Sequence, residues 1–260
     1  MSRERPLILL TNDDGYLARG LNALKEALLE LGDILVIAPD RPRSSISNAV
    51  TLHKPLRVEL IHLSDACAVY SCNGTPADCV ALGIRAICDR MPDLVISGIN
   101  DGENVGDDII YSGTVAAAVE GALHGVTSFA ISIASKSSQP HYETACEVAV
   151  RLSQYLLNEP LQDRAVLNVN VPDVPISEVK GVAITSRGKK RYVGRIEMRY
   201  DPQGRPYYWR GSERAVIEDE EGSDVTALMQ GYVSITPLQA DNTAFHLLPF
   251  LKERLKSLLT

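Results

Sequence analysis

The chain has 260 residues, of which 45% are hydrophobic and 23% charged, and its formal net charge is −7. A chain of this size can bury a large core without a disulfide or structural metal, and its acidity argues against a surface that coats nucleic acid. The apolar run at residues 7–10 is too short for a signal peptide or a membrane span. We therefore expect a cytoplasmic protein whose partners include neither a membrane nor a nucleic acid polymer. The five cysteines are scattered without a CxxC pair, which favours buried, reduced thiols.

Up to residue 172, short apolar runs alternate with amphipathic stretches. Leucines recur at steps of four and three residues through one stretch and predict a helix there, at Leu17, Leu21, Leu24, Leu28 and Leu31. The same reasoning predicts further helices at 75–90, 114–124 and 141–158, and strands at 7–10, 34–37, 58–61, 68–71, 94–97, 129–133 and 165–169. The alternation of strands with helices indicates an α/β fold, in which a mostly parallel sheet is flanked by helices on both faces.

The character of the sequence changes after Pro172. A basic segment at 187–191 is followed by a segment at 199–214 that is rich in Tyr, Arg, Gly and Pro, and then by an acidic segment at 218–224. We predict antiparallel hairpins that project from the core, a return strand at 232–235 and a C-terminal helix at 245–259. This divides the chain into a core, residues 1–172, and a hairpin arm with a C-terminal segment, residues 173–260. The basic segment could guide anions to a site, although a solvated charged face explains it more simply.

Polar residues follow three of the predicted strands, at the edge where an open parallel sheet binds its ligands. Asp13 and Asp14 come after the first strand, and two carboxylates this close repel each other unless a cation lies between them. Their oxygens suit Mg²⁺ or Mn²⁺. Ser44 and Asn100, after two other strands, offer neutral oxygens that would complete such a site. Each residue also has a simpler explanation, because Asn-Asp-Asp-Gly is good turn chemistry and serine and asparagine are common in loops.

A second group of residues suits an anion. The sequence Tyr-Ser-Gly-Thr precedes the predicted helix at 114–124, and the free amides at a helix start attract phosphate. Ser112 and Thr114 could add hydroxyl donors, although simple N-capping explains them too. With Asn104 and its neighbouring glycines they suggest a phosphate pocket, which we assign to Asn12, Asn104, Ser112, Gly113 and Thr114.

Several of these segments resemble the SurE family of survival-protein nucleotidases. The run SGINDGENVGDDIIYSGT at 97–114 fits the family pattern SGxNxGxNxGxDxxYSGT throughout. The segments 11–15, 38–47 and 74–79 and the run GYVSITPL near the end match as well. The resemblance implies a Rossmann-like core, with a protruding hairpin and a C-terminal segment that make oligomer contacts in a homodimer or homotetramer. It also implies a phosphatase with one divalent ion per subunit, held by Asp13, Asp14, Ser44 and Asn100.

We accordingly expect a metal-dependent phosphomonoesterase that acts on nucleoside 5′-monophosphates, and also on 3′-monophosphates or short polyphosphate. Asp13 and Asp14 are the expected catalytic residues. Asp14 would accept a proton from an attacking water, whereas a rival mechanism gives Asp13 a covalent role. Two non-enzymatic alternatives stay open: a metal or nucleotide sensor, and an oligomeric scaffold in which Asn-Asp-Asp-Gly is only a turn. Asp101 and Glu103 add negative charge beside Asn100, which either weakens substrate binding or tightens metal binding.

Overall fold

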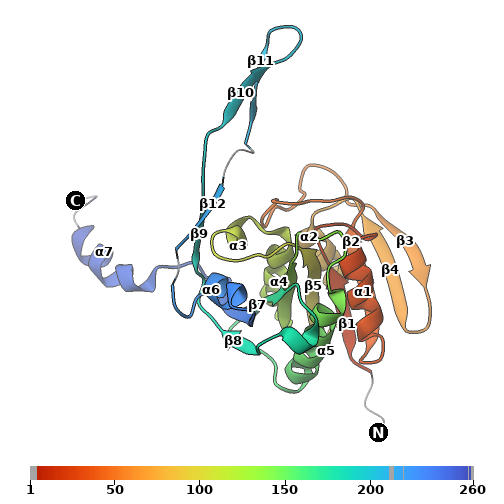
Figure 1. Ribbon diagram of the computed structural model, residues 1–260. Coiled ribbons are helices and arrows are strands. Elements are labelled where there is room, and N and C mark those ends of the chain that lie inside the picture. Colours follow the sequence, from red (N-terminus) through yellow and green to blue (C-terminus); the bar gives the residue numbers. More distant parts are fainter. Residues whose placement is uncertain (1–4, 211–213, 219, 257, 259–260) are drawn as a thin grey trace.

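The computed structural model describes residues 5–210, 214–218, 220–256 and 258. Within them the chain forms one central sheet of nine strands, flanked by helices (Figure 1). In spatial order the strands are β3 (Val58–Leu63), β4 (Cys67–Cys72), β2 (Asp33–Pro39), β1 (Leu7–Thr11), β5 (Leu94–Asp101), β6 (Ser128–Ala134), β7 (Ala165–Pro172), β13 (Val233–Gln239) and β8 (Val182–Ile184). The strands from β4 to β7 are parallel, while β3 and β13 run antiparallel to their neighbours in this series. The predicted α/β fold with a mostly parallel sheet is confirmed.

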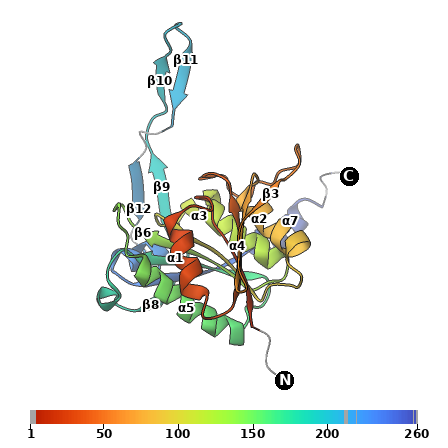
Figure 2. The same ribbon diagram turned by 90° about the vertical axis from the view of Figure 1, so that its right-hand side faces the viewer.

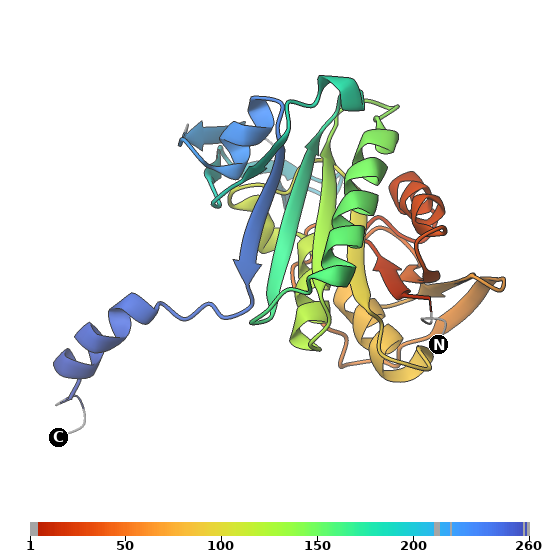
Figure 3. The same cartoon turned by 90° about the horizontal axis from the view of Figure 1, so that it is seen from below.

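Helices cover both faces of the sheet (Figure 3). The helices α1 (Arg19–Leu28) and α5 (Tyr142–Asn158) pack side by side on one face, and α2 (Pro76–Leu82) and α4 (Gly113–Leu123) pack on the other. The predicted leucine stripe explains the position of α1, because Leu21, Leu24 and Leu28 are all buried. Leu17, which is 74% exposed, and Leu31 both lie outside the helix, so the periodic pattern overestimated the length of α1 at both ends.

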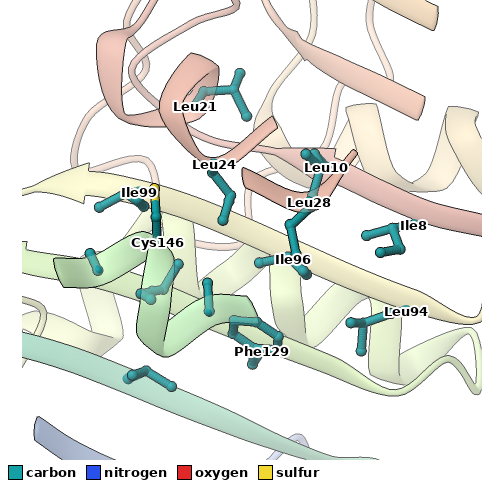
Figure 4. Packing of buried hydrophobic residues seen from close by; sticks show 14 of the residues in the cluster. Ile8, Leu10, Leu21, Leu24, Leu28, Leu94, Ile96, Ile99, Phe129 and Cys146 are labelled. Atoms are coloured by element: carbon teal, nitrogen blue, oxygen red, sulfur yellow. The ribbon is translucent and has the colours of Figure 1, made fainter. Parts of the chain in front are cut away.

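The main core lies between the sheet and the face formed by α1 and α5 (Figure 4). Leu24 and Leu28 reach down from α1 towards side chains of the central strands, among them Ile96 of β5 and Phe129 of β6. Phe129 is fully buried. The strands are apolar on both faces because a second cluster, on the side of α2 and α4, covers the other side of β1, β2 and β5.

The helix predicted at 75–90 is wrong beyond Leu82. There α2 passes into a single π-helical turn, Gly83–Ile87, which is closed by the amide of Cys88 donating to the carbonyl of Gly83 over 2.8 Å. Cys79 lies on α2 and is fully buried, whereas Cys88 follows the π-helical turn in an extended conformation and is only partly buried. Thr75 caps the helix start as predicted, because its side chain accepts a hydrogen bond from the amide of Asp78.

The hairpin arm projects from the body (Figures 1 and 2). At its base β9 (Lys189–Val193) pairs with β12 (Arg214–Glu218), and at its tip β10 (Glu197–Tyr200) pairs with β11 (Pro206–Trp209). This confirms the predicted hairpin. The return strand is β13, so residues beyond 172 still contribute to the central sheet.

Three short helices complete the described part of the chain. The predicted C-terminal helix is shorter than expected, since a 3₁₀ turn at Phe245–Leu247 precedes α7 (Leu248–Arg254), and residues 257, 259 and 260 lie outside the described residues. The helices α3 (Asp108–Tyr111) and α6 (Asp224–Met229) were not predicted. No helix in the described ranges is both long and apolar enough to cross a bilayer.

Truncation of the core should measure how far the fold depends on the packing of β6. We expect Phe129→Ala to lower the free energy of unfolding by about 3–5 kcal/mol, because it removes a fully buried ring and leaves a cavity. Leu17→Ala, at an exposed position, should change it by less than about 0.5 kcal/mol. Guanidinium unfolding of both variants at one protein concentration gives the comparison, and equal midpoints would contradict this account of the core.

Candidate active site

The loops after β1, β2 and β5 meet at the carboxyl edge of the sheet, as the topology requires, and surround a cavity of about 530 Å³. We call it the acidic cavity because five carboxylates line it. A hollow of similar size between β8 and α6 lacks such a concentration of charge, so chemistry rather than volume identifies the site. The four predicted metal ligands line the acidic cavity together with Asn104 and Ser112. The complete lining is Asp13, Asp14, Ser44, Ser45, Asn100, Asp101, Glu103, Asn104, Asp108, Tyr111, Ser112, Tyr192 and Arg210.

Three of the predicted phosphate-binding residues lie behind this lining. The hydroxyl of Thr114 donates to Oδ1 of Asp13 over 2.5 Å, so Thr114 orients that carboxylate. Gly113 packs against the same side chain: a Cβ atom at Gly113 would lie 2.9 Å from Cβ of Asp13. The side chain of Asn12 closes the turn after β1, because its amide exchanges two hydrogen bonds of 3.1 Å with the backbone of Gly15. The phosphate-binding role of these residues stays a prediction.

The two adjacent aspartates differ in their environment. Asp13 is 5% exposed, and burial raises its pKa, while the hydrogen bond from Thr114 acts in the opposite direction. Asp14 is less buried, but burial together with the negative charges of Asp13 and Asp101 raises its pKa to about 6. The backbone of Asp101 acts in the opposite direction and partly offsets this rise in pKa. The site thus gathers negative charge that a bound cation would stabilise.

An irregularity in β5 places Asn100 at the cavity. The register of β5 against β6 shifts between Ser97 and Asn100, which re-aims the side chains that follow. Gly98 permits the shift, because its φ is 145° and a Cβ atom there would lie 2.3 Å from the carbonyl oxygen of Ile131. The amide nitrogen of Asn100 donates to the carbonyl of Gly102 over 2.7 Å, which leaves its side-chain oxygen available to a ligand.

The loop that carries Ser44 is fastened on both sides of this residue. The amide of Arg43 donates to the carbonyl of Asp13 over 2.7 Å, and the amide of Ser47 donates to the carbonyl of Tyr111 over 3.0 Å. Ser45 and Ser47 have positive φ angles of 57° and 53°, which serine rarely adopts. The exposed Ser44 is therefore held beside Asp13 by its neighbours rather than by its own contacts.

Asn104 is held by two asparagines of β7. Its backbone amide donates to Oδ1 of Asn170 over 2.8 Å, and its backbone carbonyl accepts from the side chains of Asn168 and Asn170. Its own side-chain nitrogen donates to the hydroxyl of Ser132 over 2.8 Å. An amide nitrogen has two hydrogens, so one stays available for a ligand in the cavity.

The base of the hairpin arm supports the same loop, which the sequence did not reveal. Lys190 of β9 is only 6% exposed, and its ammonium lies 2.9 Å from Glu103 and 2.7 Å from Asp108. Burial opposes its charge, but the hydrogen bonds to these two carboxylates outweigh burial and raise its pKa. The fully buried carboxylate of Asp224 accepts from the amides of Gly106 and Gly188 over 3.0 Å and 2.8 Å. The solvated face expected for residues 187–191 is therefore wrong for Lys190.

The acidic cavity contains donors for a hard cation but no preassembled cage. Within the described ranges no group of three or more His, Cys, Asp or Glu side chains is arranged to hold a metal ion. A cation here would instead combine the carboxylates of Asp13 and Asp14 with the neutral oxygens of Ser44 and Asn100, which all line one cavity. Oxygen-only ligation with two carboxylates fits Mg²⁺ or Mn²⁺, which keep several waters, better than it fits zinc.

Removal of the buried cation should show how strongly the arm supports this loop. We expect Lys190→Met to destabilise the fold by roughly 2–4 kcal/mol, because Glu103 and Asp108 lose their shared partner while Glu103 keeps some contact with solvent. Lys189→Met, next in the strand and exposed, should leave the unfolding midpoint nearly unchanged. Urea unfolding measures both, and equal effects would show that burial of Lys190 is unimportant.

Wild type and Lys190→Met should also differ in how their free energy of unfolding depends on pH. Burial acts to raise the pKa of Glu103, but the interaction with Lys190 outweighs burial and holds the pKa below its ordinary value of 4.5. A carboxylate of this kind stabilises the fold above that value, and the contribution is lost as the pH falls through the lowered pKa. The difference in stability between wild type and Lys190→Met should therefore narrow below pH 4.5. A difference that stays constant down to pH 3 would contradict this assignment.

Comparison with known proteins places the chain in a family. Residues 8–194 match the family model described as Survival protein SurE. A protein from Pelobacter propionicus named 5′-nucleotidase SurE is 46% identical over 238 residues, which cover 92% of this chain and 95% of that protein. One of the same name from Carboxydothermus hydrogenoformans is 42% identical over 96% of this chain and 97% of its own length. The crystal structure of the Sure protein from Aquifex aeolicus is similar with a TM-score of 0.83 and 41% identity, over 95% of this chain and 99% of that chain. The chain therefore belongs to the SurE family.

Proposed function

We propose that this protein is a phosphomonoesterase that hydrolyses nucleoside 5′-monophosphates to nucleoside and phosphate with the help of one divalent ion, Mg²⁺ or Mn²⁺, per subunit. The observation that carries this proposal is the convergence of Asp13, Asp14, Ser44 and Asn100 on one cavity, which also receives Ser112 at the start of α4. The names of the relatives support nucleotidase activity.

Asp13, Asp14, Ser44 and Asn100 would hold the ion. When bound, a divalent ion in such a site polarises a phosphoryl oxygen and lowers the pKa of a water. Its charge would also offset the repulsion between the two aspartates, which burial and the charge of Asp101 increase. Thr114 and Gly113 keep Asp13 in place from behind.

The start of α4 would orient the phosphate. The first amides of a helix lack partners within it, and the helix dipole favours an anion at this end. The hydroxyl of Ser112 accepts a hydrogen bond from the amide of Val115 over 3.1 Å, so its own hydrogen can be donated to a phosphate oxygen. Asn104, which lines the same cavity, would supply a further donor through its second amide hydrogen.

Phosphate release tests the reaction and its need for a metal. The substrates are 5′- and 3′-nucleoside monophosphates and short polyphosphates, each with Mg²⁺, with Mn²⁺ and with EDTA. We expect phosphate release from the 5′-monophosphates, and we expect EDTA to abolish it. Asp13→Asn should lower kcat/KM by at least roughly 100-fold, because removing a residue that binds the metal should cost more than removing a residue that only contacts such a ligand. Asp65→Asn, on the exposed turn between β3 and β4, is the matched control.

Release that persists in EDTA would contradict metal dependence. Nucleotide binding without any release, by protein whose near-ultraviolet circular dichroism shows it folded, would favour the alternative of a sensor protein.

We also propose that the protein is a homodimer or homotetramer. The helix α7 stands apart from the sheet (Figure 3), and its segment exposes the large apolar side chains of Phe245, Phe250 and Leu255. The strands at the tip of the arm are exposed along their whole length. Apolar surface of this kind typically marks a contact between proteins. Sedimentation at micromolar concentration should show a dimer or tetramer, and a monomer alone would contradict the proposal.

A further inference from the structure

Tyr192 brings an aromatic ring from the base of the hairpin arm into the wall of the acidic cavity. It lies on β9 and lines the cavity together with the predicted metal ligands Asp13, Asp14 and Asn100. Its side chain is 44% exposed, so a substantial part of the ring is open to solvent or a ligand. Most of the lining consists of carboxylates, hydroxyls and amides. Tyr192 is one of two aromatic residues in the lining.

The ring of Tyr192 is held in a defined orientation. Burial and the nearby carboxylate of Asp108 raise the pKa of its hydroxyl. The ammonium of Lys190 lies 5.9 Å from the ring centroid and is itself fixed by Glu103 and Asp108. A ring fixed before binding loses little conformational freedom when a ligand stacks on it, so more of the interaction contributes to affinity.

The arrangement of charge indicates which part of a substrate this wall contacts. The phosphate would be bound where Asp13, Asn100 and the start of α4 meet, and the rest of the ester must extend from there through the cavity. Glu103 and Asp108 also line the cavity but are already paired with Lys190. Asp101 and Arg210 contribute charges of opposite sign, so this part of the cavity has no strong preference for a second charged group. A neutral, planar group with a π face is the chemistry that suits an exposed tyrosine ring in such surroundings.

We infer that Tyr192 recognises the nucleoside part of the substrate by stacking on its base, an assignment that rests on the proposed nucleotidase function. Stacking accepts every base, since each has a π face, and favours the larger purines. The hairpin arm thus takes part in substrate selection as well as projecting towards other molecules.

Tyr111 is the other aromatic residue of the cavity, but it is less suited to a test. It is adjacent to Ser112, and its carbonyl accepts the hydrogen bond from Ser47 that fastens the Ser44 loop. Substitution of Tyr111 would therefore disturb the phosphate and metal side of the site, whereas Tyr192 enters from a separate element.

The test compares nucleotides with a substrate that lacks only the base. Phosphate release is measured from AMP, GMP, CMP, UMP and ribose 5-phosphate for wild type, Tyr192→Ala and Tyr192→Phe. We expect Tyr192→Ala to lower kcat/KM on the nucleotides by on the order of tenfold or more, mainly through KM, with the larger loss on purines. Its activity on ribose 5-phosphate should stay within about twofold of wild type, and Tyr192→Phe should keep most of the nucleotide activity because it retains the ring.

The matched control is Tyr155→Ala, which removes an exposed tyrosine from α5, outside the cavity and away from the arm, and should leave all substrates unaffected. If Tyr192→Ala does not fold, as judged by circular dichroism and sedimentation, Tyr192→Leu replaces it as a non-aromatic variant of similar bulk.

Equal losses on ribose 5-phosphate and on nucleotides would overturn the inference, because Tyr192 would then only support the loop. Unchanged kinetics on every substrate would overturn it as well. Failure of the proposed function gives a different result, since wild-type protein would then release no phosphate from nucleotides, and the assignment of Tyr192 would fall with it.

Discussion

The interaction on which the site depends is the repulsion between two neighbouring carboxylates at the end of β1. Asp13 and Asp14 are both withdrawn far enough from water for burial to raise their pKa, and Asp101 adds a further negative charge. The hydroxyl of Thr114 lessens this cost with a hydrogen bond to Asp13, and the backbone of Asp101 acts to lower the pKa of Asp14. Like charges held this close destabilise a fold unless a ligand compensates them. A cation bound between the two carboxylates would replace their mutual repulsion with attraction to its own charge.

Much of the architecture could be predicted from the sequence. The central strands are short runs of apolar residues that are buried on both faces, and such runs are visible without any structure. The site followed from one topological rule, because residues after parallel strands meet at one edge. This rule placed Asp13, Ser44 and Asn100 around a single cavity, although the ligand roles of these residues remain predictions.

What the sequence could not predict depends on contacts between distant segments. Lys190 is one of several cations in a row, and no periodicity shows that it alone turns inwards to reach Glu103 and Asp108. Asp224 lies in an acidic segment of the kind that is usually solvated. In the structure it is fully buried, and its carboxylate accepts hydrogen bonds from the amides of Gly106 and Gly188. The π-helical turn after Leu82 was missed because a single turn of wider hydrogen bonding leaves no mark in the pattern of apolar residues.

The carboxylate of Asp224 has a consequence for how the arm can vary. By accepting from Gly106 and from Gly188, it joins the loop of the acidic cavity to the chain just before β9. The tip strands β10 and β11 lie beyond this junction and are exposed throughout. Mutations that change the length or the side chains of the tip therefore act on a segment that does not contribute to the contacts of Asp224. The outer surface of the tip can thus change without displacing the residues that line the acidic cavity.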